Sequence, residues 1–102
     1  MILIFITCKN QKEAEKIGLV LLKKKLAACF LVIPGVSSSY RWLGRVKRVS
    51  ETILLLKTQP QKFSQIEREI KKLHSYSIPM IAQIPVKAVN KEYLKWLQAE
   101  LR

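Results

Sequence analysis

The sequence predicts an α+β fold, in which helices alternate with the strands of one sheet. Four β-rich segments are present, of which the second and third are joined by a short turn and the others are separated by segments whose apolar residues recur at helical spacing. A hydrophobic content of 49% in 102 residues is enough for a packed core and excludes intrinsic disorder. At this length we expect a single domain over residues 1–102.

The first two elements are predicted from the N-terminal quarter of the chain. Met1–Thr7 is almost continuously apolar, as in a strand that is covered on both faces or lies at the centre of a sheet. Asn10 and Glu13 have the spacing of a capping box, so a helix is expected to begin there and to run to about Lys25. Its apolar positions are Ala14, Ile17, Leu21 and Leu22.

A long hairpin is predicted next. The strand from Ala28 to Trp42 is expected to bend at Pro34-Gly35, and Leu43-Gly44 supplies the turn. The returning strand covers Arg45 to Thr58. Because Val46 and Val49 break its two-residue period, we expect a bulge near Lys47-Arg48.

The C-terminal half predicts two helices and one strand. Pro60 is suited to a first helical position, and the helix that follows is expected to end at His74. Met80–Val86 is the fourth strand, and Pro85 predicts that it lies at an edge. Asn90 is expected to cap the last helix.

The predicted order is βαββαβα, which is the ferredoxin-like arrangement with an added C-terminal helix. The hairpin from Ala28 to Thr58 is much longer than two typical strands. An isolated ribbon with Tyr40 and Trp42 near its tip would expose aromatic surface to water. We therefore expect neighbouring copies of the chain to pack against it through Tyr40 and Trp42.

The charge of the chain favours anionic partners. There are 19 Lys and Arg against 7 acidic residues, giving a net charge of +12. A solvated basic surface is the simpler explanation. No apolar run approaches the length of a membrane span, and the two cysteines, Cys8 and Cys29, stand outside any CxxC pair. These features predict reduced thiols and a cytoplasmic protein without a membrane partner.

Six blocks of the sequence carry a resemblance to the CutA family of divalent-cation tolerance proteins. The blocks span nearly the whole chain, and their order is specific although each alone is weak. They are Leu26–Cys29, Ile33–Gly35, Ser39–Gly44, Glu51–Thr58, His74–Pro79 and Tyr93–Leu97.

The resemblance implies a ferredoxin-like subunit in an interlocked cytoplasmic homotrimer, linked to copper tolerance and able to bind Cu2+ or another divalent metal. The sequence departs from the family pattern after the loop histidine, where Ser75 and Met80 replace the usual Pro and Glu. Ile6 and Leu73 occupy places where some members carry a metal-binding Cys and a second His. Of that arrangement only His74 remains.

His74 and Cys29 are the metal-ligand candidates. One chain offers two Cys, one His and two Met, too few for a closed site, so copies would have to share ligands. The alternatives are that Cys29 fills the core, that His74 caps a helix, and that Cys8 is an incidental thiol.

A cleft between subunits is the second candidate site. Glu51 and Lys57 lie on one face of the same strand by its two-residue period, and Tyr76 and His74 could complete a small polar pocket. An ion pair or hydrogen-bonded anchor at the trimer interface is the alternative. The sequence contains no GxSxG motif and no nucleophile with an adjacent base, so we do not expect an enzyme.

Two functions remain open at this point. The first is a trimeric protein that binds copper and takes part in the response to metal ions. The alternative is a trimeric signalling or scaffold module that binds an anionic small ligand in the intersubunit cleft, like the similarly folded PII-like proteins. Nucleic-acid binding is not expected, because the strands lack the stacking aromatics of an RRM.

Overall fold

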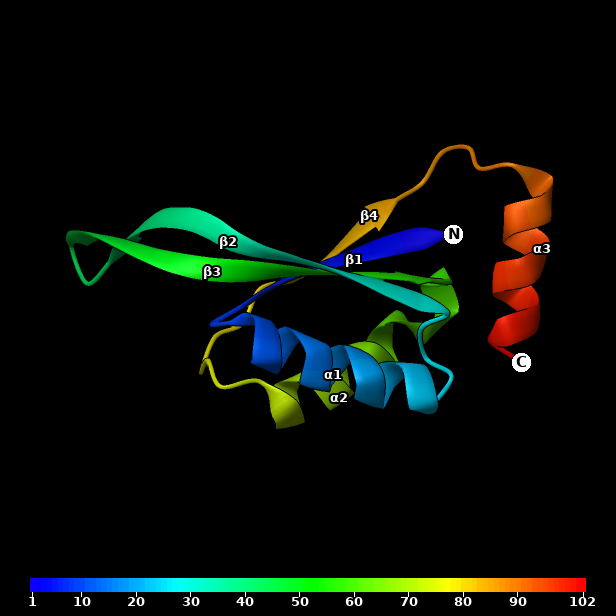
Figure 1. The fold of residues 1–102 in the computed structure, drawn as a ribbon, viewed down its shortest axis with the longest axis horizontal. Helices are drawn as coiled ribbons and strands as arrows, with labels where there is room; N and C mark the ends of the chain where they lie inside the picture. The colour runs from blue at the N-terminus through cyan, green and yellow to red at the C-terminus, as the bar shows by residue number, and fades with distance from the viewer.

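The computed structural model describes all residues from Met1 to Arg102. It is elongated, with principal extents of 46 × 26 × 21 Å (Figure 1). The observed order confirms the predicted α+β, ferredoxin-like fold with an added C-terminal helix. The elements are β1 (Ile2–Cys8), α1 (Gln11–Lys23), β2 (Cys29–Trp42), β3 (Arg45–Thr58), the 3-10 turn η1 (Pro60–Lys62), α2 (Phe63–Leu73), β4 (Ile81–Pro85) and α3 (Lys91–Glu100).

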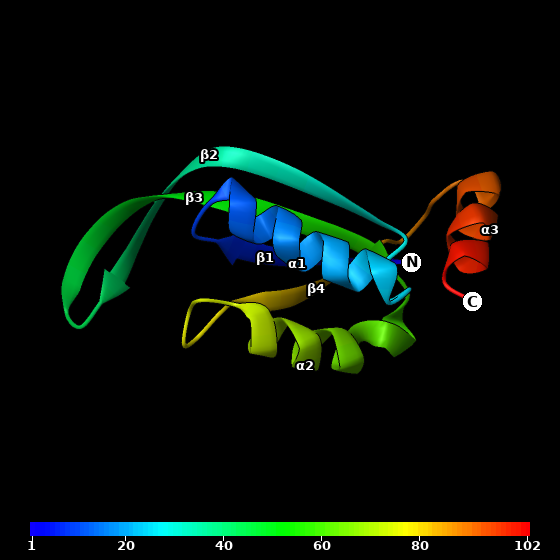
Figure 2. The same ribbon diagram turned by 60° about the horizontal axis from the view of Figure 1, so that its bottom comes forward.

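The four strands form one antiparallel sheet in the order β2-β3-β1-β4. β1 lies at the centre of the sheet, which was one of the two predicted placements. β4 pairs only with β1, so its predicted position at an edge is confirmed. Helices α1 and α2 both lie against the same face, as Figures 1 and 2 show.

The core fills the space between these two helices and the sheet. Alternate residues of β1 point into it, and the strand has a strictly alternating burial pattern. Within the single chain the helices cover only one face of β1. The fully buried residues include Ile4, Ile6 and Cys8 of β1, Ile17 and Leu21 of α1, Leu54 and Leu56 of β3, and Ile66 and Ile70 of α2.

Helix α1 approaches the sheet closely at Gly18. A Cβ atom placed on Gly18 would lie 2.6 Å from the ring of Phe30, which is shorter than any normal van der Waals contact. Phe30 lies on β2 and packs against the core. The glycine therefore makes room for the aromatic ring between helix and sheet.

The predicted start of α1 is confirmed. The backbone N–H of Glu13 donates to Oδ1 of Asn10 at 2.9 Å, which is an N-cap hydrogen bond. The Glu13 carboxylate completes no capping box, because it accepts a hydrogen bond from the backbone N–H of Lys9. The helix ends at Lys23, two residues before the predicted end.

The bulge of the hairpin lies on β2, so its predicted position near Lys47-Arg48 was wrong. The register shifts between Ile33 and Val36, where β2 holds one residue more than β3. Pro34 has no N–H to donate, and Gly35 takes a φ of 71°, which glycine adopts without strain. The outer part of the hairpin extends beyond β1 and β4 (Figure 1).

The second half follows the prediction with small differences. A 3-10 turn from Pro60 precedes α2, and His74 follows the last residue of α2 as predicted. β4 is two residues shorter than predicted. Asn90 precedes α3, but its side chain makes no capping hydrogen bond. No helix combines the length and the apolar character that a membrane span needs.

The face of the sheet opposite α1 and α2 carries no helix, apart from the contact of α3 with Lys57 at one end (Figure 2). We call it the open face. The strand register places apolar side chains side by side across it. They are Leu3 and Phe5 of β1, Leu31 and Ile33 of β2, Ile53 and Leu55 of β3, and Ala82 and Ile84 of β4.

Candidate functional site

Three potential metal ligands meet where β1, α1 and α2 converge. Cys8 ends β1, Glu13 lies in the first turn of α1, and His74 follows α2. A ligand atom of each residue lies within 4.8 Å of a ligand atom of the other two. We call this group the Cys8–Glu13–His74 cluster.

The imidazole of His74 is held at both nitrogens. Nε2 lies 2.8 Å from the backbone oxygen of Thr7, and Nδ1 accepts a hydrogen bond from the backbone N–H of Tyr76 at 3.0 Å. Because Nδ1 accepts, the proton is on Nε2, which donates to Thr7. The ring therefore joins the end of α2 to β1. The ring does not bond the last carbonyls of α2, but the backbone N–H of His74 donates to the carbonyl of Ile70 at 2.8 Å, so His74 is the C-cap of the helix, as one of the two interpretations predicted.

Glu13 connects α1 to the loop after α2. Its two carboxylate oxygens accept from the backbone N–H groups of Lys9 and Ser75, each at 3.0 Å. Burial tends to raise the pKa of Glu13, but these hydrogen bonds and the nearby His74 outweigh it and lower the pKa below its usual range. The carboxylate is therefore ionised and fixed in position.

Cys8 is a core residue, whereas the sequence suggested an incidental thiol at the entrance to a loop. Its side chain is fully buried at the end of β1. Burial, together with the charges of Glu13 and Glu51, raises the pKa of Cys8 to about 12. The thiol keeps its proton at neutral pH, so a metal ion would have to displace that proton to bind the sulfur.

The donor atoms of the cluster fit a transition metal, since thiolate, imidazole and carboxylate are all ligands of copper and zinc. Each donor is already engaged in the metal-free chain. His74 and Glu13 accept or donate hydrogen bonds, and Cys8 is protonated. A bound ion must therefore replace a proton and at least one of these hydrogen bonds.

The second predicted metal ligand, Cys29, does not join this cluster. Through its strand partner Lys57, Cys29 is level with Leu3 of β1. His74 instead bonds Thr7, near the other end of β1. Four residues of extended strand separate these points, or roughly 13 Å. The structure thus places His74 and Cys29 at opposite ends of the sheet.

Lys57 also lies away from the other predicted cleft residues. Its Nζ donates to the hydroxyl of Tyr93 on α3 at 3.1 Å. This hydrogen bond raises the pKa of Lys57 despite its partial burial. Within one chain β3 carries Lys57 and Glu51 to opposite ends of the sheet. A cleft that joins Lys57 to Glu51 and Tyr76 needs a second copy of the chain and stays a prediction.

Glu51 and Tyr76 do come together. The Tyr76 hydroxyl donates to Oε2 of Glu51 at 2.6 Å, and Glu51 is buried. Burial and the Glu51 carboxylate raise the pKa of Tyr76, so the hydroxyl remains a donor at all ordinary pH values. The ring of Tyr76 also lies 4.7 Å from that of His74, which connects this pair to the metal-ligand cluster.

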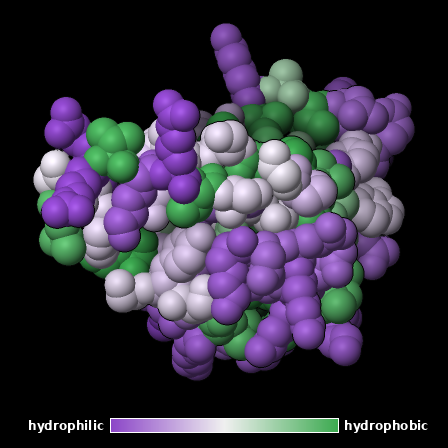
Figure 3. Space-filling view, turned by 60° about the vertical axis from the view of Figure 1, so that its left-hand side comes forward, coloured by the Kyte–Doolittle hydropathy of each residue, from purple (hydrophilic) through white to green (hydrophobic).

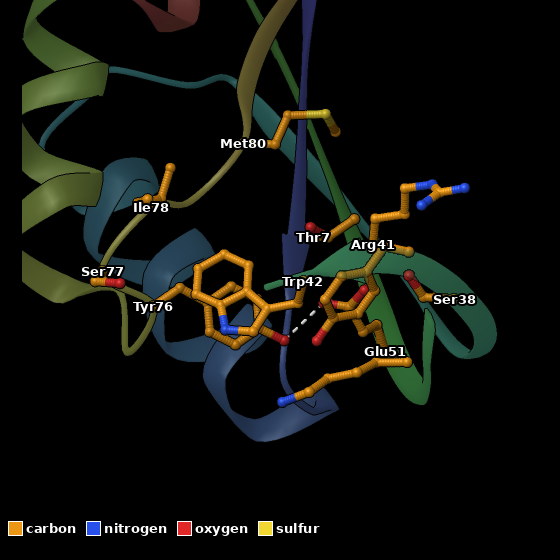
Figure 4. Close-up of a pocket in the computed structure, with 11 residues that line it drawn as sticks. Thr7, Ser38, Arg41, Trp42, Glu51, Tyr76, Ser77, Ile78 and Met80 are labelled. Carbon is orange, nitrogen blue, oxygen red and sulfur yellow. Dashed lines mark hydrogen bonds between the residues drawn. The ribbon is translucent and has the colours of Figure 1, made fainter. Parts of the chain in front are cut away.

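A cavity of about 570 Å³ lies beside the Glu51–Tyr76 pair (Figure 4). The hairpin forms one wall with Tyr40, Trp42 and Lys47, and the loop before β4 forms the other with Ile78 and Met80. Met80 takes the place where the resemblance led us to expect an acid. The cavity therefore holds one carboxylate, that of Glu51, and it is already hydrogen-bonded.

Sequence analysis found His74, Glu51 and Tyr76 but missed Cys8 and Glu13. Glu13 was noticed only as a helix-capping residue, and that role explains its position without any role as a metal ligand. Cys8 carried none, because its proximity to Glu13 and His74 depends on the packing of α1 and α2 against β1.

Comparisons with known proteins agree with this fold. Residues 2–100 match the family model described as CutA1 divalent ion tolerance protein. The divalent-cation tolerance protein CutA of Thermus thermophilus is 38% identical over 95 residues, covering 93% of this chain and 92% of that protein. Its counterpart in Archaeoglobus fulgidus is 39% identical over 94 residues, covering 92% and 91%.

Solved structures give the same result. The structure of the periplasmic divalent cation tolerance protein CutA from Archaeoglobus fulgidus superposes with a TM-score of 0.96 at 37% identity, covering 100% of both chains. That of CutA1 from Oryza sativa gives 0.96 at 31% identity, covering 99% of this chain and 93% of that one. On this evidence the chain belongs to the CutA1 divalent ion tolerance family.

Proposed function

We propose that this protein binds divalent copper and takes part in tolerance of divalent metal ions. The observation that carries the proposal is the Cys8–Glu13–His74 cluster, in which three different donor types lie within 4.8 Å of one another. Copper(II) is preferred because it forms the strongest complexes among the divalent first-row metals with nitrogen, oxygen and sulfur ligands. The protein acts by binding, and we propose no catalytic step.

His74 is the central ligand of the proposed site. Coordination at Nδ1 would replace the hydrogen bond from the Tyr76 N–H, whereas coordination at Nε2 would replace the bond to Thr7. In either case metal binding should change the loop that follows α2. Loss of the Cys8 proton should accompany it.

Cys29 is proposed as a separate, weaker candidate. Within one chain it belongs to no group of three potential ligands, since the only such group is the Cys8–Glu13–His74 cluster. Cys29 becomes a ligand only if another copy of the chain supplies the remaining donors. We also propose a cytoplasmic location, in which both free cysteines would stay reduced.

We propose that the protein assembles as a homotrimer. The open face supports this, because soluble proteins seldom leave the apolar residues of four strands without a second layer. The long hairpin also presents Tyr40 and Trp42 at 40% and 43% exposure. Packing of the open faces and hairpins of three copies would cover both surfaces with closed symmetry.

The test is to titrate metal-free protein with Cu(II), and separately with Cu(I) under reducing conditions, and to measure the binding by calorimetry. Light scattering on the same samples gives the mass of the assembly. We expect saturable binding that weakens by at least about tenfold in His74→Ala and in Cys8→Ser. Cys29→Ser is the matched control, because it also removes one thiol, and we expect its affinity to be unchanged.

Equal copper affinity in the native protein and in all three variants would reject the Cys8–Glu13–His74 cluster as the site. Weakening in Cys29→Ser alone would move the site to the open face and to ligands shared between copies. A monomeric mass at micromolar concentration would reject the homotrimer whatever the copper result.

A further inference from the structure

The layer formed by α1 and α2 carries a row of lysines on the side away from the sheet. Lys12, Lys16 and Lys23 are exposed, and their spacing of four and seven residues places them on one side of α1. The buried residues Ile17 and Leu21 lie on the opposite side of the helix, against the core. The three lysines therefore point outward.

Helix α2 adds cations that point the same way. Arg68, Lys71 and Lys72 are exposed, and they lie on the side of α2 opposite the buried Ile66 and Ile70. Because the two helices lie side by side against one face of the sheet, their outer sides form a single surface (Figure 2). We call these six cations of α1 and α2 the basic helix face.

Most of the charge on the basic helix face has no partner in the chain. Lys71 pairs with Glu67 at 3.3 Å and Lys72 with Glu69 at 3.8 Å, both within α2. The other four cations take part in no salt bridge. Glu15 is the one exposed acid of α1, and it pairs with none of them. The face therefore keeps a positive potential, which raises the local concentration of anions.

An apolar side chain lies among these cations. Leu19 is 47% exposed, and it shares the outer side of α1 with Lys16, three residues before it, and Lys23, four residues after it. Figure 3, in which the two helices form the lower part, shows hydrophobic side chains set singly among hydrophilic ones. Phosphate or carboxylate groups alone would leave Leu19 without a partner. A surface that is anionic outside and apolar beneath would accommodate both kinds of side chain.

We propose that the basic helix face binds the surface of a membrane that contains anionic lipids. The cations pair with the lipid headgroups, and Leu19 inserts between them at the boundary with the acyl chains. The face stays accessible in the proposed homotrimer, because the copies pack through their open faces and hairpins, and the helices lie on the other side of the sheet (Figure 2). It shares no residue with the Cys8–Glu13–His74 cluster, so it does not depend on copper binding.

Nucleic acid is the competing partner, because lysines also pair with its phosphates. Two features favour the membrane. α1 has no aromatic residue and α2 has only Phe63, which packs against the core, so bases find no ring to stack on. α1 also lies beside α2 and against the sheet, so it cannot enter a major groove as a single helix does. The sequence predicted no membrane partner because it has no apolar run long enough for a span, but a surface contact needs no such run.

The test measures co-sedimentation of the assembled protein with lipid vesicles. We expect binding to vesicles made of equal parts of phosphatidylglycerol and phosphatidylcholine, no binding to pure phosphatidylcholine, and weaker binding as salt is added. Removing the three lysines of α1 together should weaken the binding about a hundredfold, or roughly fivefold for each cation. This triple variant combines Lys12→Gln, Lys16→Gln and Lys23→Gln.

A second triple variant is the matched control, because it removes the same charge from exposed lysines elsewhere in the chain. It combines Lys87→Gln, Lys91→Gln and Lys95→Gln, in and just before α3. We expect its affinity for the anionic vesicles to be unchanged, since salt screens charges that lie away from the membrane. Leu19→Ser should weaken vesicle binding about fivefold without changing the net charge. Light scattering checks that every variant keeps the native mass.

Several outcomes would overturn the proposal. Absence of binding to the anionic vesicles would leave the basic helix face as a solvated surface. Equal weakening in the two triple variants would mean attraction by net charge alone, and equal binding to both kinds of vesicle would mean unspecific apolar contact. Unchanged vesicle binding in Leu19→Ser would remove the reason to prefer a membrane. Binding to duplex DNA but not to vesicles, lost in the α1 triple variant, would assign the face to nucleic acid.

Discussion

The hydroxyl of Tyr76 donates a 2.6 Å hydrogen bond to the carboxylate of Glu51, and this is the only hydrogen bond to the Glu51 side chain in the chain. It ties the loop after α2 to the middle of β3, across the end of β1. A buried carboxylate with one partner depends strongly on that partner. The pair therefore fixes the wall shared by the cavity and the Cys8–Glu13–His74 cluster.

Tyr76→Phe should lower the free energy of unfolding by about 2 kcal/mol, because it leaves the Glu51 carboxylate buried without a donor. Urea unfolding at one fixed protein concentration measures the change, since the stability of an assembly depends on concentration. Tyr40→Phe is the control: Tyr40 lines the same cavity, and no side-chain hydrogen bond involves its hydroxyl. A loss of equal size in both variants would argue against the Glu51 contact as the cause.

Gly18→Ala should destabilise the protein, although alanine is the better helix former by about 1 kcal/mol. The new Cβ would lie 2.6 Å from the Phe30 ring, and overpacking of this kind costs about 1–3 kcal/mol. Thermal unfolding of Gly18→Ala, Phe30→Leu and the double variant measures the coupling. Gly18→Ala should be less harmful in the Phe30→Leu background than beside the native Phe30 ring. An alanine that stabilises the native chain would contradict the close approach.

The fold could be predicted from the sequence because the signals that indicate each helix and strand are local. The cap at Asn10, the helical period of α1 and α2, and Pro85 at the edge strand each act within one element. The misplaced bulge shows where such signals fail. The break between Val46 and Val49 reflected an exposed ribbon, in which neither face is buried and the period carries no information. The extra residue was instead at Pro34-Gly35, where we expected only a bend.

The site was only partly predictable, for a different reason. Glu51 and Lys57 share a face of β3, but six residues of extended strand keep them roughly 20 Å apart. A shared face therefore did not mean a shared pocket. Cys8 and Glu13 joined His74 only through tertiary packing, which brings the C-terminal end of α2 beside the loop between β1 and α1.

Acid should weaken the contact between α1 and α2 through Glu69. The hydrogen bond from Lys24 at 3.0 Å lowers the pKa of Glu69 below 4.5, against a smaller opposing effect of burial. Because the folded pKa is below the unfolded one, ionised Glu69 stabilises the fold above pH 4.5, and this contribution is lost as the pH falls through the folded pKa.

Glu69→Gln should therefore be less stable than the native chain at pH 7 and equally stable well below pH 4.5. Urea unfolding across this pH range gives the difference. Lys24→Gln is the companion variant, and in that background the effect of Glu69→Gln should be smaller. A difference between Glu69→Gln and the native chain that is constant with pH would contradict the assignment.

The open face can be tested with two leucines of matched exposure. Leu31 lies on the open face and is 45% exposed, whereas Leu19 lies on the outer side of α1 and is 47% exposed. If copies pack through the open face, Leu31→Glu places a charge without a partner in a buried interface, which costs several kcal/mol per ion. Leu19→Glu places the same charge in water.

Light scattering should therefore show that Leu31→Glu dissociates into monomers and that Leu19→Glu keeps the native mass. Because the two substitutions are chemically identical and start from the same exposure in the single chain, only contact with another copy can separate them. Equal masses for both variants would show that the open face is not the surface through which the chain assembles.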